Sequence, residues 1–166
     1  MDASSVEKIL GALNGAGVRY LIAGGLAVVA HGHVRFTKDL DLIIALDEDN
    51  VRRGIGALSE LGFAPVVAAV RIEDFADAGK RHEWVRDKGA TVFTLFSDQH
   101  RMTPIDIFID APLPFERAYA DALEQEYAPN LSVRFVGRGD LLSMKRLAGR
   151  PQDLLDIEVL ERLSQS

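Results

Sequence analysis

Two aspartates, Asp39 and Asp41, stand two residues apart in an apolar run that continues to Ile44. Side chains on a β-strand alternate between the two faces, so both carboxylates point the same way while Leu40 and Leu42 point into a core. Neighbouring carboxylates repel, and each raises the pKa of the other. A divalent cation would remove that repulsion, and Mg²⁺ prefers ligands from one or two carboxylates and from substrate phosphates. The pair therefore predicts a magnesium site.

A glycine pair, Gly24-Gly25, precedes Asp39 with thirteen residues between them. The apolar run 20–23 before it predicts a strand, and the alanine- and valine-rich run 26–31 after it predicts a short helix. Glycine has no Cβ, so its backbone N–H approaches an anion closely, and a helix N-terminus adds partial positive charge. The glycine turn and the aspartates would thus hold opposite ends of a metal-bound triphosphate.

The glycine pair and residues 35–41, RFTKDLD, together resemble the signature of the nucleotidyltransferase superfamily, the polymerase-beta-like fold. The pattern is similar to that of small bacterial members, the AbiEii-like and related uncharacterised nucleotidyltransferase domains. The resemblance implies transfer of a nucleoside monophosphate from an NTP, with two Mg²⁺ ions (or Mn²⁺) held by three carboxylates. It also implies nucleotide-binding roles for Gly24, Gly25, Arg35 and Thr37. The competing interpretation is an ordinary hairpin or βαβ unit whose acids lie in water.

A third acid, Asp106, interrupts the apolar run 104–109. An unpaired carboxylate is costly to bury among such residues, and a metal shared with the first two aspartates would remove that cost. In the resembled family the third carboxylate comes from a later strand of this pattern, which matches Asp106. Asp110 shares its face but lies at the strand end, so it is the weaker candidate. The alternative is that Asp106 faces solvent on a one-sided sheet.

Residues 138–164 predict a helical hairpin, with Gly149 ending one helix and Pro151 starting the next. The pattern Leu-x-x-Lys-x-x-Ala-Gly-Arg-x-x-Asp is similar to the C-terminal motif of the AbiEii-like enzymes. The resemblance implies that Lys145 reaches substrate phosphates and that Asp153 supports the site. The competing interpretation is an amphipathic helix pair with a solvated Lys145, which would contribute little to stability.

Two further features describe this C-terminal region. Residues 131–150 hold five basic residues and one acid, which fits an anion-facing surface. The apolar side of the second helix is expected to consist of Leu155, Ile157, Leu160 and Leu163.

The rest of the chain predicts alternating helices and strands. A first helix over 4–15 would be capped by Ser4 or Ser5, with Glu7 completing a capping box. Asp47 caps a second helix that reaches Leu61. Further expected elements are strands at 63–70, 91–96, 123–127 and 131–136 and a short helix at 114–122.

The charged stretch 71–89 contains Trp84 and His82. The favoured interpretation is a solvated charged face with Trp84 anchored in the core, and the alternative is contact of either residue with a base or acceptor.

Composition restricts the class of protein. The chain has 166 residues, 48% of them hydrophobic and 27% charged, which suits one domain over 1–166 with a core at about 18–110. The absence of cysteine excludes disulfides and thiolate metal sites. The four histidines do not have the spacing of a metal site. With no signal-like N-terminus and no membrane-length apolar run, the sequence predicts a cytoplasmic protein with no membrane partner. A net charge of −6 argues against a general nucleic-acid binder.

These observations predict an α+β protein with the nucleotidyltransferase fold: a small mixed, twisted β-sheet with flanking helices and a C-terminal helical hairpin. The expected activity is metal-dependent transfer of NMP from NTP to an acceptor hydroxyl. The acceptor would be RNA or protein if the chain is the toxin of a toxin–antitoxin pair, with an antitoxin protein as partner. The alternatives are a nucleotidyltransferase for a small molecule, an aminoglycoside or lincosamide antibiotic, and a non-catalytic nucleotide-binding or interaction module.

Overall fold

A mixed sheet of seven strands forms the centre of the computed structural model, which describes residues 1–163. The strand order is β3-β4-β5-β2-β1-β7-β6. Strand β2 pairs in parallel with β5, and β1 pairs in parallel with β7. The other neighbours are antiparallel. The predicted α+β class with a mixed sheet is therefore confirmed.

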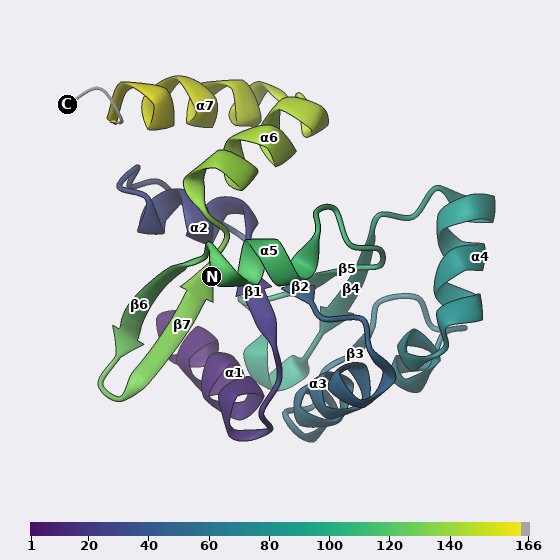
Figure 1. Cartoon of the computed structure of the whole chain (residues 1–166). Helices are drawn as coiled ribbons and strands as arrows, with labels where there is room; N and C mark the ends of the chain where they lie inside the picture. The colour runs from purple at the N-terminus through teal and green to yellow at the C-terminus, as the bar shows by residue number, and fades with distance from the viewer. Residues whose placement is uncertain (164–166) are drawn as a thin grey trace.

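Helices and strands alternate along the chain as far as β6, which is followed by β7, α6 and α7 (Figure 1). The strands are β1 (Tyr20–Ile22), β2 (Leu40–Ile44), β3 (Ala64–Pro65), β4 (Val92–Phe96), β5 (Ile105–Phe108), β6 (Leu123–Ala128) and β7 (Leu131–Phe135). The α-helices are α1 (Ala3–Gly15), α2 (Gly24–Ala30), α3 (Glu48–Glu60), α4 (Ala78–Lys88), α5 (Phe115–Ala120), α6 (Arg138–Ala148) and α7 (Pro151–Leu163). Two 3₁₀ helices are η1 (Ile72–Ala76) and η2 (Asp98–His100).

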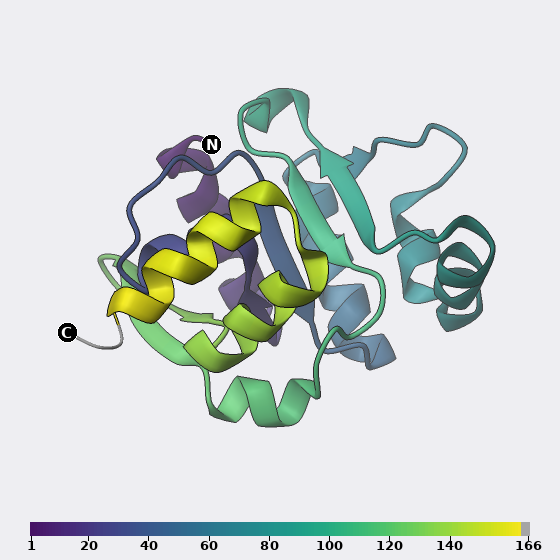
Figure 2. The same ribbon diagram turned by 90° about the horizontal axis from the view of Figure 1, so that it is seen from above.

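The helices surround the sheet unevenly. In Figure 1, α1 and α3 lie below the sheet, and the hairpin of α6 and α7 stands above it over α2. Seen from above, the same hairpin covers the central strands, while α4 lies away from it at the far side (Figure 2). The aliphatic side chains of β1 and β2 are almost completely buried, as expected for central strands covered on both faces. The hairpin and α2 therefore lie on one side of the sheet, and α1 and α3 lie on the other.

The first helix is capped differently from the expectation. Helix α1 begins at Ala3, and the Asp2 carboxylate accepts a hydrogen bond from the Ser5 N–H at 2.8 Å. The predicted cap at Ser4 or Ser5, with its capping box, is therefore wrong. Aspartate caps as well as serine does, and its charge adds a favourable interaction with the helix N-terminus. The predicted cap of α3 is confirmed, since the Asp47 carboxylate accepts from the Asn50 N–H at 3.0 Å.

The region after α3 also differs from the prediction. The strand expected over 63–70 is reduced to the two residues of β3 at the sheet edge, because Pro65 has no N–H to continue a ladder. In the stretch 71–89, Trp84 of α4 is partly buried and stacks on Phe93, with ring centroids 5.3 Å apart. His82 is exposed. These contacts support a packing role for Trp84.

The predicted C-terminal hairpin is present, and Gly149 ends α6 with a positive φ of 62°. The last residue of the predicted hairpin, Ser164, lies outside the described residues. The predicted apolar side of α7 is only partly correct: Leu160 is buried, but Leu155 and Leu163 are exposed. Helix α7 instead buries two acids, Asp153 and Asp156, because cationic side chains face them.

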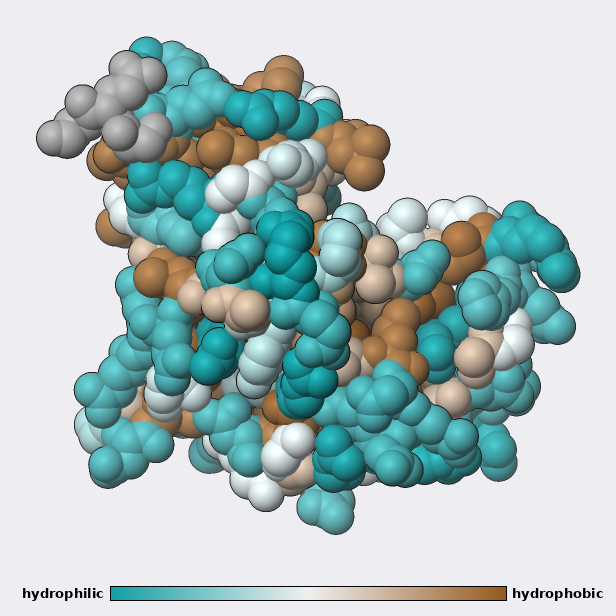
Figure 3. Space-filling view, in the orientation of Figure 1, coloured by the Kyte–Doolittle hydropathy of each residue, from teal (hydrophilic) through white to brown (hydrophobic). Residues whose placement is uncertain are grey.

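The surface of the hairpin is correspondingly apolar in places. Figure 3 shows hydrophobic patches on it, where Leu147, Leu154 and Leu155 are exposed. Within the described part of the chain, no helix has the length and apolar character needed to cross a bilayer.

Candidate active site

The three predicted aspartates converge at neighbouring strands. Asp41 of β2 is the direct register partner of Asp106 of β5, so the two side chains share one face of the sheet. Asp39 lies one residue before β2 and two residues from Asp41, which places it on the same face. The two motifs therefore lie side by side in the sheet, although Asp41 and Asp106 are 65 positions apart in the sequence.

The charges of these carboxylates are poorly compensated. Burial, followed by the negative charges of Asp106 and Asp39, raises the pKa of Asp41 to about 6 in total. Burial and the charge of Asp106 likewise raise the pKa of Asp39. Two influences oppose the shift at Asp41: the positive charge of Arg150 and a hydrogen bond from the Gly25 N–H. The cluster therefore holds excess negative charge in a partly buried position.

The glycine pair packs directly on the aspartates. Gly24 has a φ of 56°, and a Cβ there would lie 1.8 Å from Oδ2 of Asp41. A Cβ on Gly25 would lie 2.2 Å from Oγ1 of Thr37. Only glycine therefore fits at both positions. Helix α2 begins at Gly24 rather than at Leu26 as expected, and it has seven residues.

Asp106 has a partner that sequence reasoning missed. The hydroxyl of Thr94 donates to Oδ1 of Asp106 at 2.6 Å, and the two residues are register partners of β4 and β5. The contact fixes the orientation of one carboxylate oxygen. The strand expected over 91–96, shortly before the apolar run 104–109, was the available signal, but a one-residue change of register would have placed a different residue opposite Asp106.

Lys145 lies in a different environment from the one expected. Its side chain is 5% exposed, and Nζ lies 3.0 Å from Oδ1 of Asp153 and 2.7 Å from Oδ2 of Asp156. The interpretation of Lys145 as a solvated lysine is wrong, because two buried acids of α7 face it. Contact of Lys145 with a phosphate stays a prediction.

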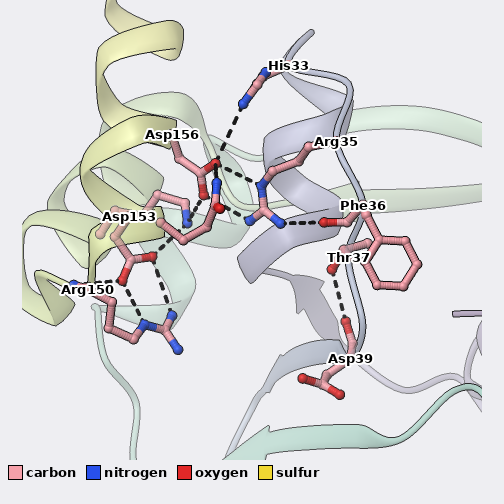
Figure 4. A network of polar contacts seen from close by, with 10 residues as sticks. His33, Arg35, Phe36, Thr37, Asp39, Arg150, Asp153 and Asp156 are labelled. Carbon is pink, nitrogen blue, oxygen red and sulfur yellow. Dashed lines mark hydrogen bonds and ion pairs between the residues drawn. The ribbon is translucent and has the colours of Figure 1, made fainter.

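Arg35 belongs to the same ion network, which Figure 4 shows from close by. Its Nε and Nη2 lie 2.8 Å and 2.9 Å from the two carboxylate oxygens of Asp156. Its Nη1 donates to the Phe36 carbonyl at 2.8 Å. Arg35 thus ties the segment leading to Asp39 to the hairpin. Thr37, in the same segment, makes a long 3.5 Å hydrogen bond to the Asp39 carbonyl.

The acids of this network are held in their charged forms. Burial alone would raise the pKa of Asp153, but hydrogen bonds from Arg150 and Lys145 outweigh it and lower the pKa to about 2. At Asp156, burial is likewise outweighed by hydrogen bonds from Lys145 and Arg35, so its pKa is lowered. The network, unlike the aspartate cluster, supplies its own counter-charges.

The cluster has the composition of a magnesium site. Three carboxylates on one sheet face with excess negative charge match the oxygen ligands that Mg²⁺ and Mn²⁺ prefer. Across residues 1–163, no group of three or more Asp, Glu or His side chains is arranged so that it could hold a metal ion as it stands. A magnesium site at the aspartate cluster therefore stays a prediction, which rests on the donor chemistry and on the shared sheet face.

Fold and site together describe an α+β domain that gathers three carboxylates against a glycine turn. No protein-family model matches the chain, and no curated protein matches it. The functional assignment accordingly depends on the geometry of the site itself.

Proposed function

We propose that this protein is a metal-dependent nucleotidyltransferase that moves an NMP from an NTP to an acceptor hydroxyl. The observation that supports it best is the register pairing of Asp41 with Asp106, with Asp39 on the same face and Gly24 packed on Asp41. A cluster of like charges at a glycine turn has little use in folding, because its own repulsion destabilises it. Its composition fits a site for a metal–triphosphate complex.

The side chains have distinct roles in this proposal. Asp39, Asp41 and Asp106 would hold two Mg²⁺ ions, which when bound neutralise the triphosphate and lower the pKa of the attacking hydroxyl. The Thr94 hydroxyl orients Asp106. Arg35 keeps the segment that carries Thr37 and Asp39 in place, since its Nη2 donates to Asp156 and its Nη1 to the Phe36 carbonyl.

The acceptor divides the proposal into two branches. Transfer to RNA or protein would make the chain a toxin with an antitoxin partner, in a cytoplasm that supplies NTP and acceptor. Transfer to an aminoglycoside or lincosamide would make it a resistance enzyme. A non-catalytic nucleotide-binding module is the third candidate.

A labelling experiment tests the activity and separates the branches. The purified protein is incubated with Mg²⁺ and each α-labelled NTP, together with total RNA, a protein extract or a panel of antibiotics. Transfer of label should require Asp41 and Asp106 and should persist in Asp110→Asn, a control for an exposed acid at the end of the same strand. Binding of Mg²⁺–NTP without label transfer to any acceptor would favour the non-catalytic module.

A further inference from the structure

The five basic residues of 131–150 do not form the anion-facing surface that the sequence predicts. Arg134 pairs with Glu124, Arg138 donates to the His31 carbonyl and Arg146 pairs with Glu161. Lys145 is buried between two acids. These four side chains contact protein partners. The fifth basic residue, Arg150, is the most exposed to solvent of the five that form ion pairs or hydrogen bonds here.

Arg150 occupies the turn between α6 and α7, directly before Pro151. Its side chain is 75% exposed, although it is anchored to the buried Asp153. Three contacts fix it: its backbone N–H donates to Oδ2 of Asp153 at 3.2 Å, Nε to the same oxygen at 2.7 Å, and Nη2 to Oδ1 at 3.4 Å. A cation held this firmly while open to solvent has lost the conformational entropy that binding an anion would otherwise cost.

The orientation of Arg150 connects the hairpin with the aspartate cluster. In Figure 4 its side chain leaves the hairpin on the side where Asp39 lies. The guanidinium of Arg150 therefore lies on the side of the hairpin that faces Asp39.

The balance of charges within the network also indicates that Arg150 is the residue available to an anion. Arg35, Lys145 and Arg150 supply three positive charges, and Asp153 and Asp156 supply two negative ones. The two inner cations are matched by the two acids. The surplus positive charge is therefore at the exposed member, next to a cluster with surplus negative charge.

We propose that Arg150, rather than Lys145, contacts the phosphate groups of the nucleotide, and that Asp153 and Lys145 position it from behind. This inference rests on the proposed function, because it assumes a triphosphate held near Asp41 by metal. Arginine suits the role, since its planar fork binds a phosphate with two donors and stays charged throughout the pH range. Lys145 acts through Asp153 and is a positioning residue.

Calorimetric titration with Mg²⁺–tripolyphosphate and with non-hydrolysable analogues of the four NTPs tests the inference on the full chain. Arg150→Ala should weaken binding of tripolyphosphate by about 10- to 100-fold, the range for losing a hydrogen bond to a charged group. It should also reduce the salt dependence of binding, and Arg150→Lys should restore part of the affinity. The melting temperature should fall only modestly, because Asp153 keeps Lys145 as a partner after the Arg150 side chain is removed.

Arg146→Ala is the matched control: it removes the same residue type from the same hairpin, but its guanidinium pairs with Glu161. Equal tripolyphosphate affinities for wild type and Arg150→Ala would overturn the inference, and so would a wild type that binds neither tripolyphosphate nor any analogue. If wild type binds and Arg150→Ala does not, yet no acceptor is ever labelled, the inference stands and the proposed transfer reaction fails.

Discussion

Two groups of charged side chains lie close together in this molecule and differ in how their charges are balanced. In the aspartate cluster, Asp39 and Asp41 repel Asp106, and their pKa values are raised. In the ion network of the hairpin, the pKa values of Asp153 and Asp156 are lowered, because cations face them. The acids of the network have cationic partners within the protein, whereas the carboxylates of the cluster mainly face one another. We propose that a bound metal ion supplies the counter-charge of the cluster.

The largest expected effect comes from opening the network. Asp156 is fully buried between Lys145 and Arg35, so Asp156→Ala leaves two cations without their partner. Removing one member of a buried pair costs about 3–5 kcal/mol, and we expect that loss in the free energy of unfolding measured in urea. Lys145→Ala should be similarly destabilising. A loss below about 1 kcal/mol for both variants would mean that the network is not a structural unit.

Asp41→Asn should have the opposite profile to Asp156→Ala: it should reduce activity and leave stability intact. Label transfer should fall by about 10²–10³-fold, the range for removing one preorganised electrostatic group at a reacting phosphate. The unfolding free energy of the ligand-free protein should stay equal or rise, because a repulsion is relieved. Asp110→Asn is the control and should leave transfer unchanged. Wild-type transfer rates in Asp41→Asn would remove this aspartate from the site.

The pH dependence of stability sharpens the contrast. The pKa of Asp41 rises from 3.8 to about 6 on folding, so the folded state binds this proton more tightly and stability falls as pH rises between about 4 and 6. The loss is about 3 kcal/mol at roughly 1.4 kcal/mol per pKa unit. Urea titrations at several pH values should show this slope in wild type and not in Asp41→Asn.

Asp153 should give the reverse behaviour. Its folded pKa of about 2 is lower than its ordinary value, so the stability that it contributes is present above pH 4 and is lost as pH falls toward 2. The same titrations with Asp153→Asn provide the comparison. A common slope for both variants would show that the two regions are not electrostatically distinct.

The smallest effect is expected at the exposed pair of the hairpin. Arg146 and Glu161 lie 2.5 Å apart, but both side chains are about half exposed. Such pairs contribute about 0.2–1 kcal/mol, so Arg146→Ala should lower the unfolding free energy far less than Lys145→Ala, one residue earlier on the same helix. Equal losses for the two variants would contradict the assignment of Lys145 to the network.

The sequence predicts the aspartate cluster better than the network, for a physical reason. Alternation along a strand places Asp39 and Asp41 on one face regardless of the surroundings, and the apolar run around Asp106 marks a neighbouring strand. Burial of Asp153 and Asp156 depends on Lys145 and Arg35 arriving from other elements. Hydrophobic periodicity treats an acid as exposed, so it placed Leu155 inward and missed the paired acids.

Because β2 pairs with β5, which lies much later in the sequence, the aspartate cluster is completed late during synthesis. Asp39, Asp41 and the glycine turn leave the ribosome early, and β1 and β2 are joined by a local antiparallel pairing. Their third carboxylate arrives only with β5, through a non-local parallel contact of the kind that forms slowly. At roughly 5–20 residues per second, a nascent chain spends seconds without a full set of acids, and Arg150 follows later still. A translation product that stops before Ile105 therefore contains Asp39 and Asp41 but lacks the third carboxylate, Asp106.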